Sequence, residues 1–284
     1  MTPVLAGVFS AAAWGTADFA ARFTCRAVGA SVALLAVTLV GATSLSAWLA
    51  FSGHALPSLS ELAPWDAANG IATTISMLLL YEALRRGPLS LVSPLVGAYP
   101  LWELLLAALF MQVRPAPATW LAMAAIMAGM WIVAANDGGE SAVGRRRGTA
   151  MLAVAAGMAF GVALVFAQQA VLLHGALPAL WLGRLIGLAG LAALLVPRWR
   201  SLRVPLPWAA VLSGQGVLDT LGYLFLYASG TGLAAGIATV VSSTFGLVTV
   251  ALARVFLREP ISIRQWLGIA LVFAGVAGLS AAPR

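Results

Sequence analysis

Three polar side chains with the chemistry to bind a ligand lie inside long apolar runs of the sequence. Glu103 is the only charged residue between positions 86 and 114, and Gln215 and Asp219 stand one helical turn apart in a later run. A charged or amide side chain in hydrocarbon needs a polar partner or a water-filled cavity, so all three are candidate binding residues. Two roles stay open for Glu103: a contact at the edge of a cavity, or a partner for a group on another helix, such as Arg184.

Smaller polar residues extend this pattern over four segments. Polar or small residues fall on one helical face of 65–84 and of 89–112, and the later segments 207–228 and 231–257 carry such residues at matching intervals. Four faces of this kind would line one central cavity. The other interpretation is that small and hydroxyl residues only allow helices to pack closely.

Aromatic residues border the polar faces. A cavity with several aromatic rings and few charges would suit a neutral or zwitterionic ligand that has an apolar side chain. The alternative is that these rings pack against lipid or lie at the membrane interface. The candidate substrate-binding residues are Asn69, Thr73, Ser76, Tyr81, Ser93, Tyr99, Trp102, Glu103, Gln215, Asp219, Tyr223, Thr239 and Ser243. No catalytic and no metal-binding residue is expected.

The elements that position these residues must be membrane helices. The chain of 284 residues is 62% hydrophobic and 9% charged, whereas soluble domains carry about a quarter charged residues. About 20 apolar residues cross a bilayer, and breaks at Arg, Gly, Pro and acidic clusters separate ten such windows. Helices are expected at 3–21, 31–51, 65–84, 89–112, 117–135, 148–172, 177–196, 207–228, 231–257 and 261–281. The windows are too long and too uniformly apolar for barrel strands.

The chain repeats itself after 146 positions without a gap. This shift places Trp14-Gly15 on Phe160-Gly161 and Tyr81 on Tyr227. Shared composition can explain single matches, but it does not readily explain one offset that holds from the first helix of each half to the last. Because five helices per repeat is an odd number, the second repeat must enter the membrane from the opposite side. We therefore expect an all-α integral membrane protein with ten transmembrane helices in two inverted repeats around a central cavity: a first repeat at 1–137, a connecting loop at 138–147 and a second repeat at 148–284.

Other charged residues in the apolar windows have separate explanations. Asp18 stands one turn before Arg22, so it is expected either to form an ion pair with that arginine at the interface or to contact a ligand. Arg184 alone would cost about 2.5 to 3.5 kcal/mol on insertion, so it should bind a carboxylate or helix carbonyls. Glu82 is adjacent to a pair of arginines at the end of its window and is expected to be solvated.

The arginines predict an orientation. The connections on one side of the membrane hold twelve of them, whereas the side that contains both termini holds Arg114 and Arg284. By the positive-inside rule the side with twelve arginines is cytoplasmic, which places both termini in the periplasm.

The sequence resembles drug/metabolite transporters with two EamA-type repeats. The matching features are the aromatic-Gly pair of each repeat, Pro100, Arg184 and the segment LREPISIRQWLGIALVFAGV at 257–276. The first repeat departs from the pattern, because Val113 stands where the second repeat has Glu259. The resemblance implies two five-helix EamA repeats that export or exchange metabolites across a bacterial inner membrane by alternating access. It also implies cytoplasmic termini, against the arginine distribution, and YddG-like exporters of aromatic and neutral amino acids match the ring-rich cavity best.

Other classes of function have less support. Cys25 is the only cysteine, which argues against a disulfide or a Cys-based metal site. The sequence has no HExxH motif and no Gly-rich phosphate loop after a strand, which argues against a membrane-embedded enzyme. The dispersed arginines that give a net charge of +7 do not form a nucleic-acid surface. A non-transporting membrane subunit and an exporter of a different metabolite or of a drug-like compound remain alternatives. The expected partners are a small-molecule substrate and the lipid bilayer, without a cofactor, and a monomer is compatible with the sequence.

Overall fold

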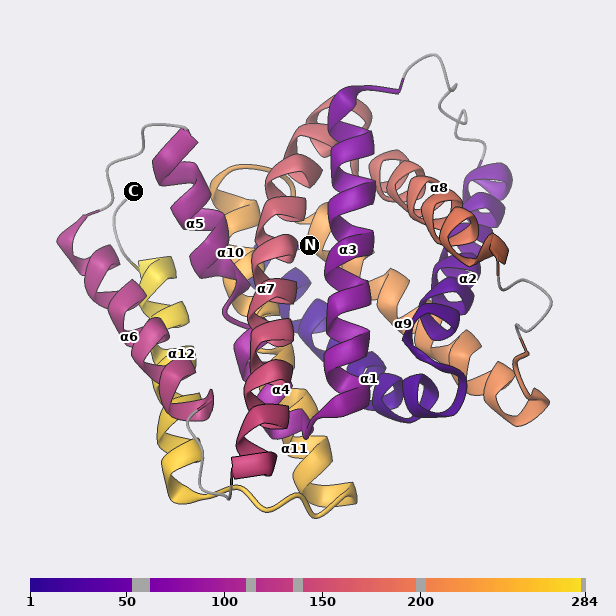
Figure 1. Ribbon diagram of the computed structural model, residues 1–284. Helices are drawn as coiled ribbons and strands as arrows, with labels where there is room; N and C mark the ends of the chain where they lie inside the picture. The colour runs from indigo at the N-terminus through magenta and orange to yellow at the C-terminus, as the bar shows by residue number, and fades with distance from the viewer. Residues whose placement is uncertain (53–61, 111–115, 135–139, 198–202, 282–284) are drawn as a thin grey trace.

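The computed structural model describes residues 1–52, 62–110, 116–134, 140–197 and 203–281 (Figure 1). Within these ranges the chain forms α-helices and no strands, as the sequence predicts. The helices are α1 (Pro3–Val28), α2 (Ala30–Phe51), α3 (Pro64–Arg86), α4 (Leu89–Val96), α5 (Tyr99–Phe110), α6 (Pro117–Ala134), α7 (Glu140–His174), α8 (Ala176–Leu195), α9 (Leu206–Ala228), α10 (Leu233–Ser242), α11 (Phe245–Phe256) and α12 (Ile263–Ala281). Eight helical segments of the described chain are long and apolar enough to cross a membrane, and Trp120–Val133 and Ile263–Gly278 are shorter apolar helices. The predicted all-α membrane fold is confirmed.

Two of the predicted spans are interrupted near their middles. Residues 89–110 form α4 and α5, and residues 233–256 form α10 and α11. In the first case Pro100 has no amide N–H to donate to the carbonyl of Val96, so the helix ends before it. In the second, the hydroxyls of Ser242, Ser243 and Thr244 each donate to the carbonyl three residues earlier, in competition with the backbone ladder. Different chemistry thus breaks both helices at the same position of the repeat.

Some sequence predictions fall outside the described residues. They include residues 111–112 of the fourth span, residue 135 of the fifth, and part of the connecting loop at 138–147. Arg114, Arg198, Arg200 and Arg284, which contribute to the orientation argument, also lie outside the described residues.

The offset of 146 residues is also visible in the backbone. Gly29 joins α1 to α2 and Gly175 joins α7 to α8, and these glycines have φ values of +88° and +80°. Such positive values are strained for residues with a Cβ atom, so both connections need glycine. The same tight turn therefore recurs at equivalent points of the two halves.

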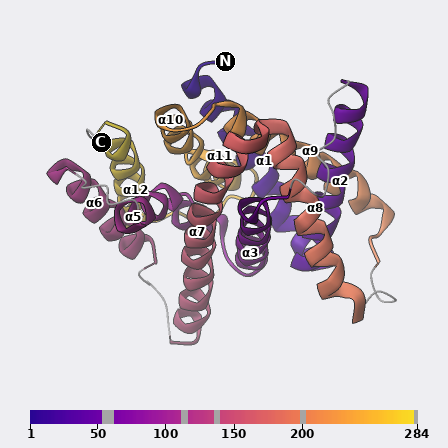
Figure 2. The same ribbon diagram turned by 90° about the horizontal axis from the view of Figure 1, so that it is seen from above.

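The two halves interlock instead of packing as separate bodies. Helix α1 packs against α9, and the equivalent helix α7 packs against α3. Close approaches recur in the same way: a methyl group on Gly70 would lie 2.8 Å from Cβ of Ile186, and one on Gly216 would lie 2.8 Å from Cβ of Val40. Figure 2 shows α1, α3 and α7 in the middle of the molecule, with α6 and α12 paired at one side.

The two helix breaks meet at the centre. A methyl group on Gly97 would lie 3.1 Å from the carbonyl oxygen of Ser243, and one on Gly246 would lie 2.9 Å from that of Ser93. Helices α4 and α11 therefore pack closely, and both lie in the lower half of Figure 1, with α5 and α10 above them.

Candidate functional site

A central cavity lies between the two repeats. Its lining comes from both halves and includes Trp14, Asp18, Ser76, Phe160, Asp219 and Tyr223. The empty space between these side chains measures about 340 Å³ including its opening. The cavity is therefore built from side chains of both halves of the chain.

Aromatic rings form much of the cavity wall. Trp14 and Phe160 are equivalent residues of the two repeats, and their ring centroids lie 5.5 Å apart in an edge-to-face arrangement. Tyr223 lies 4.8 Å from Trp14 and 5.9 Å from Phe160, centroid to centroid. Phe245, which starts α11, completes the cluster. Edge-to-face pairs of this kind hold rings in fixed positions, so the wall has a defined shape.

A buried ion pair stands beside the cavity. The guanidinium of Arg184 in α8 donates directly to the carboxylate of Asp219 in α9, and both side chains are almost fully buried. The guanidinium carbon also lies 4.8 Å from the centroid of the Tyr223 ring, a cation–π distance. Arg184 thus binds a carboxylate, as expected, but the partner is Asp219 and not Glu103.

Two hydrogen bonds join α3 to α9 at opposite ends of the cavity. Near the start of α3, the hydroxyl of Tyr227 donates to Oδ1 of Asn69 at 3.2 Å. Near its end, Nε2 of Gln215 donates to the hydroxyl of Tyr81 at 2.7 Å. The two pairs are equivalent under the repeat. The residues between them, Ser76 on α3 and Asp219 on α9, line the cavity, so the two bridges flank it.

Two further cavities adjoin this region. One is bounded by α2, α3, α8 and α9 and is lined in part by Asn69, Thr73 and Arg184. The other lies among α7, α9 and α10 and is lined in part by Gln168, Tyr227 and Thr239. Tyr223 lines both the first of these and the central cavity.

The structure places the predicted polar residues of α3 and α9 near these cavities. Ser76, Asp219 and Tyr223 line the central cavity, and Asn69 and Thr73 line a neighbouring one. Tyr81 and Gln215 are buried in a bridge, where Gln215 also accepts a hydrogen bond from Thr24 at 2.8 Å.

The predicted residues near the helix breaks are more dispersed. Thr239 lines the cavity beside α10, and its carbonyl accepts a hydrogen bond of 2.9 Å from the hydroxyl of Tyr99. The hydroxyl of Ser243 donates to the carbonyl of Val240. The hydroxyl of Ser93 and the indole N–H of Trp102 are buried and have no hydrogen-bond partner among the described residues.

Glu103 has an inter-helix role. Its carboxylate accepts a hydrogen bond of 2.8 Å from Nε2 of Gln168 in α7. This contact matches the second of the two roles considered for it, with a glutamine instead of Arg184 as the partner.

The expected ion pair between Asp18 and Arg22 is wrong. Arg22 instead lies 2.7 Å from Glu259, whose carboxylate also accepts hydrogen bonds of 3.2 Å from the backbone N–H groups of Leu89 and Ser90. Glu259 thereby caps the positive N-terminal end of α4 and neutralises Arg22. Asp18 remains in the central cavity.

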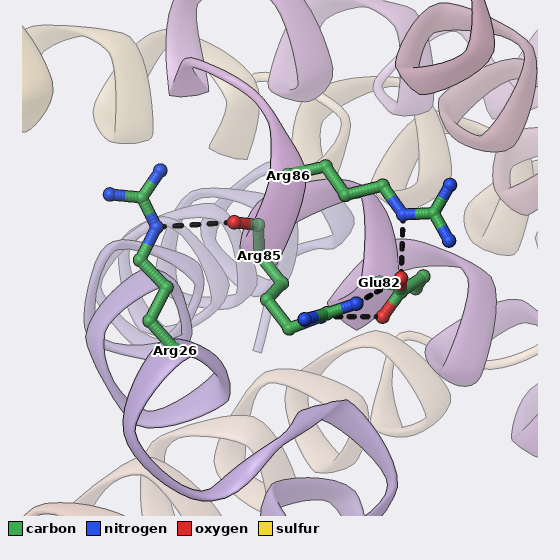
Figure 3. A network of polar contacts seen from close by, with 4 residues as sticks. All are labelled: Arg26, Glu82, Arg85 and Arg86. Carbon is green, nitrogen blue, oxygen red and sulfur yellow. Dashed lines mark hydrogen bonds and ion pairs between the residues drawn. The ribbon is translucent and has the colours of Figure 1, made fainter. Parts of the chain in front are cut away.

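Other arginine contacts lie at the same end of the molecule. Figure 3 shows Glu82 accepting hydrogen bonds from Arg85 at 2.7 and 2.8 Å and from Arg86, while Arg26 donates to the carbonyl of Arg85 at 3.1 Å. These side chains are partly exposed, so Glu82 lies at an edge, as expected, but in contact with both arginines.

Several residues of the site were missed from the sequence. Trp14, Asp18, Phe160 and Phe245 line the central cavity but were not among the candidates. The aromatic-Gly pairs, which recur at the offset of 146 residues, were the available signal for Trp14 and Phe160. For Asp18 a ligand contact was one of the two roles considered, and the alternative of an ion pair with Arg22 kept it off the list of candidates.

Comparison with known proteins agrees with this architecture. The model of the EamA-like transporter family matches residues 1–135 and 147–281. No curated protein matches the chain. A solved structure described only as the crystal structure of a protein is 18% identical, covers 98% of this chain and 97% of its own, and superposes with a TM-score of 0.68, a likeness that concerns the fold alone. Because the family match includes both halves at the offset seen in the sequence, the chain belongs to the EamA-like transporter family and is a membrane transporter of the drug/metabolite class.

Proposed function

We propose that the protein exports or exchanges small neutral or zwitterionic metabolites, and amino acids including aromatic ones in particular, by alternating access through the central cavity. The observation that carries this proposal is the cavity itself: an aromatic wall of Trp14, Phe160, Tyr223 and Phe245, with a few buried polar groups. Rings supply contact area for an apolar side chain, and isolated polar groups fix the orientation of a polar head. The proposed substrate has both parts.

The arrangement of the repeats supports alternating access. Inverted repeats allow one half to rock against the other around a site near the membrane midplane. The two bridges from α3 to α9, Asn69–Tyr227 and Gln215–Tyr81, flank the cavity at opposite ends, so opening either end requires one bridge to separate while the other holds. The broken helices α4–α5 and α10–α11 provide the points at which half of a span moves by itself.

We further propose that the protein resides in a bacterial inner membrane with the arginine-rich end in the cytoplasm. Arg22, Arg26, Arg85 and Arg86 all lie at that end, and positive residues favour the cytoplasmic side. In this orientation both termini are periplasmic.

Counterflow in proteoliposomes tests the proposed function. Vesicles that contain purified protein and unlabelled phenylalanine are placed in trace radiolabelled phenylalanine, tryptophan, leucine or glutamate. We expect accumulation of the three neutral amino acids above the level of protein-free vesicles, and no accumulation of glutamate. A folded, monodisperse protein that moves none of the neutral amino acids would refute the amino-acid proposal. Transport of other compounds under those conditions would identify a different metabolite class.

A further inference from the structure

Asp18 is a buried carboxylate that has no polar partner among the described residues. Its residue is 5% exposed, it lines the central cavity, and the described residues include no hydrogen-bond or ion-pair partner for it. Its nearest arginine along the helix is occupied, because Arg22 pairs with Glu259 at 2.7 Å. Ionisable groups inside a membrane protein are unfavourable without a partner and mark functional sites. When Asp18 is ionised, its counter-charge must therefore come from outside the described residues.

The balance of charge in the cavity indicates the sign of that ligand. Asp219 is neutralised by its contact with Arg184. Among the described residues that line the cavity, only Asp18 and Asp219 have side chains that are charged when ionised at neutral pH. The ionised cavity consequently holds one uncompensated negative charge, which a single positive charge on a ligand would balance.

The rings around Asp18 suit the same ligand. Trp14 is one helical turn before Asp18, on the same face of α1, and Phe160, Tyr223 and Phe245 line the same space. The faces of aromatic rings attract cations, and Tyr223 already accepts the guanidinium of Arg184 at 4.8 Å. Rings beside a carboxylate favour an ammonium group attached to an apolar body.

We propose that Asp18 binds the protonated amine of the transported compound, and that substrates carry one cationic nitrogen next to an apolar or aromatic group. This proposal rests on the proposed transport function and specifies its substrate class. An amino acid and a simple aromatic amine share the required ammonium group, so the test contains both.

Binding measurements on the full-length protein in nanodiscs test the proposal. The probes are phenethylamine, phenylalanine and phenethyl alcohol, which keeps the ring and chain of phenethylamine but has no charge. We expect the unmodified protein to bind phenethylamine at least tenfold more tightly than phenethyl alcohol. This comparison needs no variant, and equal affinities would overturn the proposal, as would a lack of detectable binding of both amines.

Substitution of the carboxylate makes the test specific. In Asp18→Asn and Asp18→Ser, the affinity for phenethylamine should fall at least tenfold, while that for phenethyl alcohol should change less than twofold. The matched control is Glu82→Gln, which removes a carboxylate held by Arg85 and Arg86 at the end of α3 and should change neither affinity. Equal losses for both ligands in folded Asp18 variants would refute a charge-specific site.

The outcomes separate this proposal from the transport function. Tight, Asp18-dependent binding of amines without counterflow would remove the proposed transport and retain the site. Counterflow of neutral amino acids that persists in Asp18→Asn, with unchanged affinity for phenylalanine, would retain transport and remove the site. Binding of phenethylamine but not of phenylalanine would assign the site to simple amines, and binding of both would include amino acids.

Discussion

The contribution of the buried Arg184–Asp219 ion pair to stability can be tested with substitutions taken from the other repeat. The equivalent positions in the first half are Thr38 and Thr73, which carry no charge. Replacing Arg184 or Asp219 by threonine introduces, at each position, the side chain that the other repeat already uses. The double replacement Arg184→Thr/Asp219→Thr removes both charges together.

The expected magnitudes follow from burial. Both side chains are almost fully buried, so each single replacement leaves an uncompensated charge and should lower the free energy of unfolding by about 3 to 5 kcal/mol. Loss of Arg184 also removes its cation–π contact with Tyr223, worth about 0.5 to 2 kcal/mol. The double variant loses these contacts but leaves no unpaired charge. It should therefore be more stable than either single variant by at least about 1 kcal/mol.

Reversible unfolding in mixed detergent micelles with increasing SDS, followed by tryptophan fluorescence, measures these differences. The partly exposed Glu82 serves as the control, and Glu82→Gln should change the free energy of unfolding by less than about 1 kcal/mol. A double variant that is less stable than both single variants would refute the reasoning, because the two charges would then not depend on each other.

Four further predictions address the two ends and the centre of the molecule. Glu259→Gln loses the ion pair with Arg22 and weakens the cap of α4, so it should lower the free energy of unfolding by about 1 to 3 kcal/mol in the same SDS titration; an unchanged midpoint would contradict this. Tyr81→Phe and Tyr227→Phe each remove one bridge and should each destabilise by about 0.5 to 2 kcal/mol, with additive effects in the double variant because the bridges are at opposite ends; marked non-additivity would argue against independent bridges. Gly246→Leu places a side chain against a carbonyl oxygen that would be 2.9 Å from its Cβ atom, so size-exclusion chromatography should show loss of the folded, monodisperse species, and a normal elution profile would contradict that packing. A C-terminal alkaline phosphatase fusion should be active and a C-terminal GFP fusion dark, whereas the reverse pattern would place the termini in the cytoplasm.

The fold was predictable because it depends on regularities that the sequence shows directly. Long apolar windows specify membrane helices, and one offset of 146 residues specifies two copies of the same unit. The positive φ values of Gly29 and Gly175 show that this offset extends to individual turns. An odd number of spans per copy then determines that the copies are inverted.

The breaks in the fourth and ninth spans were less accessible. Pro94 and Pro100 signal a kink, but an apolar run containing proline can continue as a bent helix. In the second half the interruption involves three successive hydroxyl side chains that bond to carbonyls of the preceding turn. Hydroxyl residues also occur in unbroken helices, so the sequence pattern did not distinguish the two cases.

The partners of the charged residues could be predicted least well. The sequence indicates that Arg184 binds a carboxylate or helix carbonyls, and both Asp219 and Glu103 lie in apolar runs. Which one is in reach depends on how α8 packs against α9, and this is a property of the tertiary structure. For Arg22, a neighbour one turn away was the obvious candidate, yet the actual partner, Glu259, comes from the far end of the chain. That Asp18 is unpaired among the described residues could be recognised only once that contact was known.

The cap of α4 by Glu259 has a consequence for the thermodynamics of transport. Two identical inverted repeats would give inward- and outward-facing states of equal energy, each populated half of the time. In this chain the positions equivalent to Arg22 and Glu259 are Gln168 and Val113, so the sequence has no equivalent ion pair for the opposite end. A net contribution of about 1.4 kcal/mol from this pair would bias the resting population tenfold toward the state in which the arginine-rich end is shut. The ion pair would then stabilise one of the two states. It would determine which side of the membrane the cavity of the empty transporter faces most of the time.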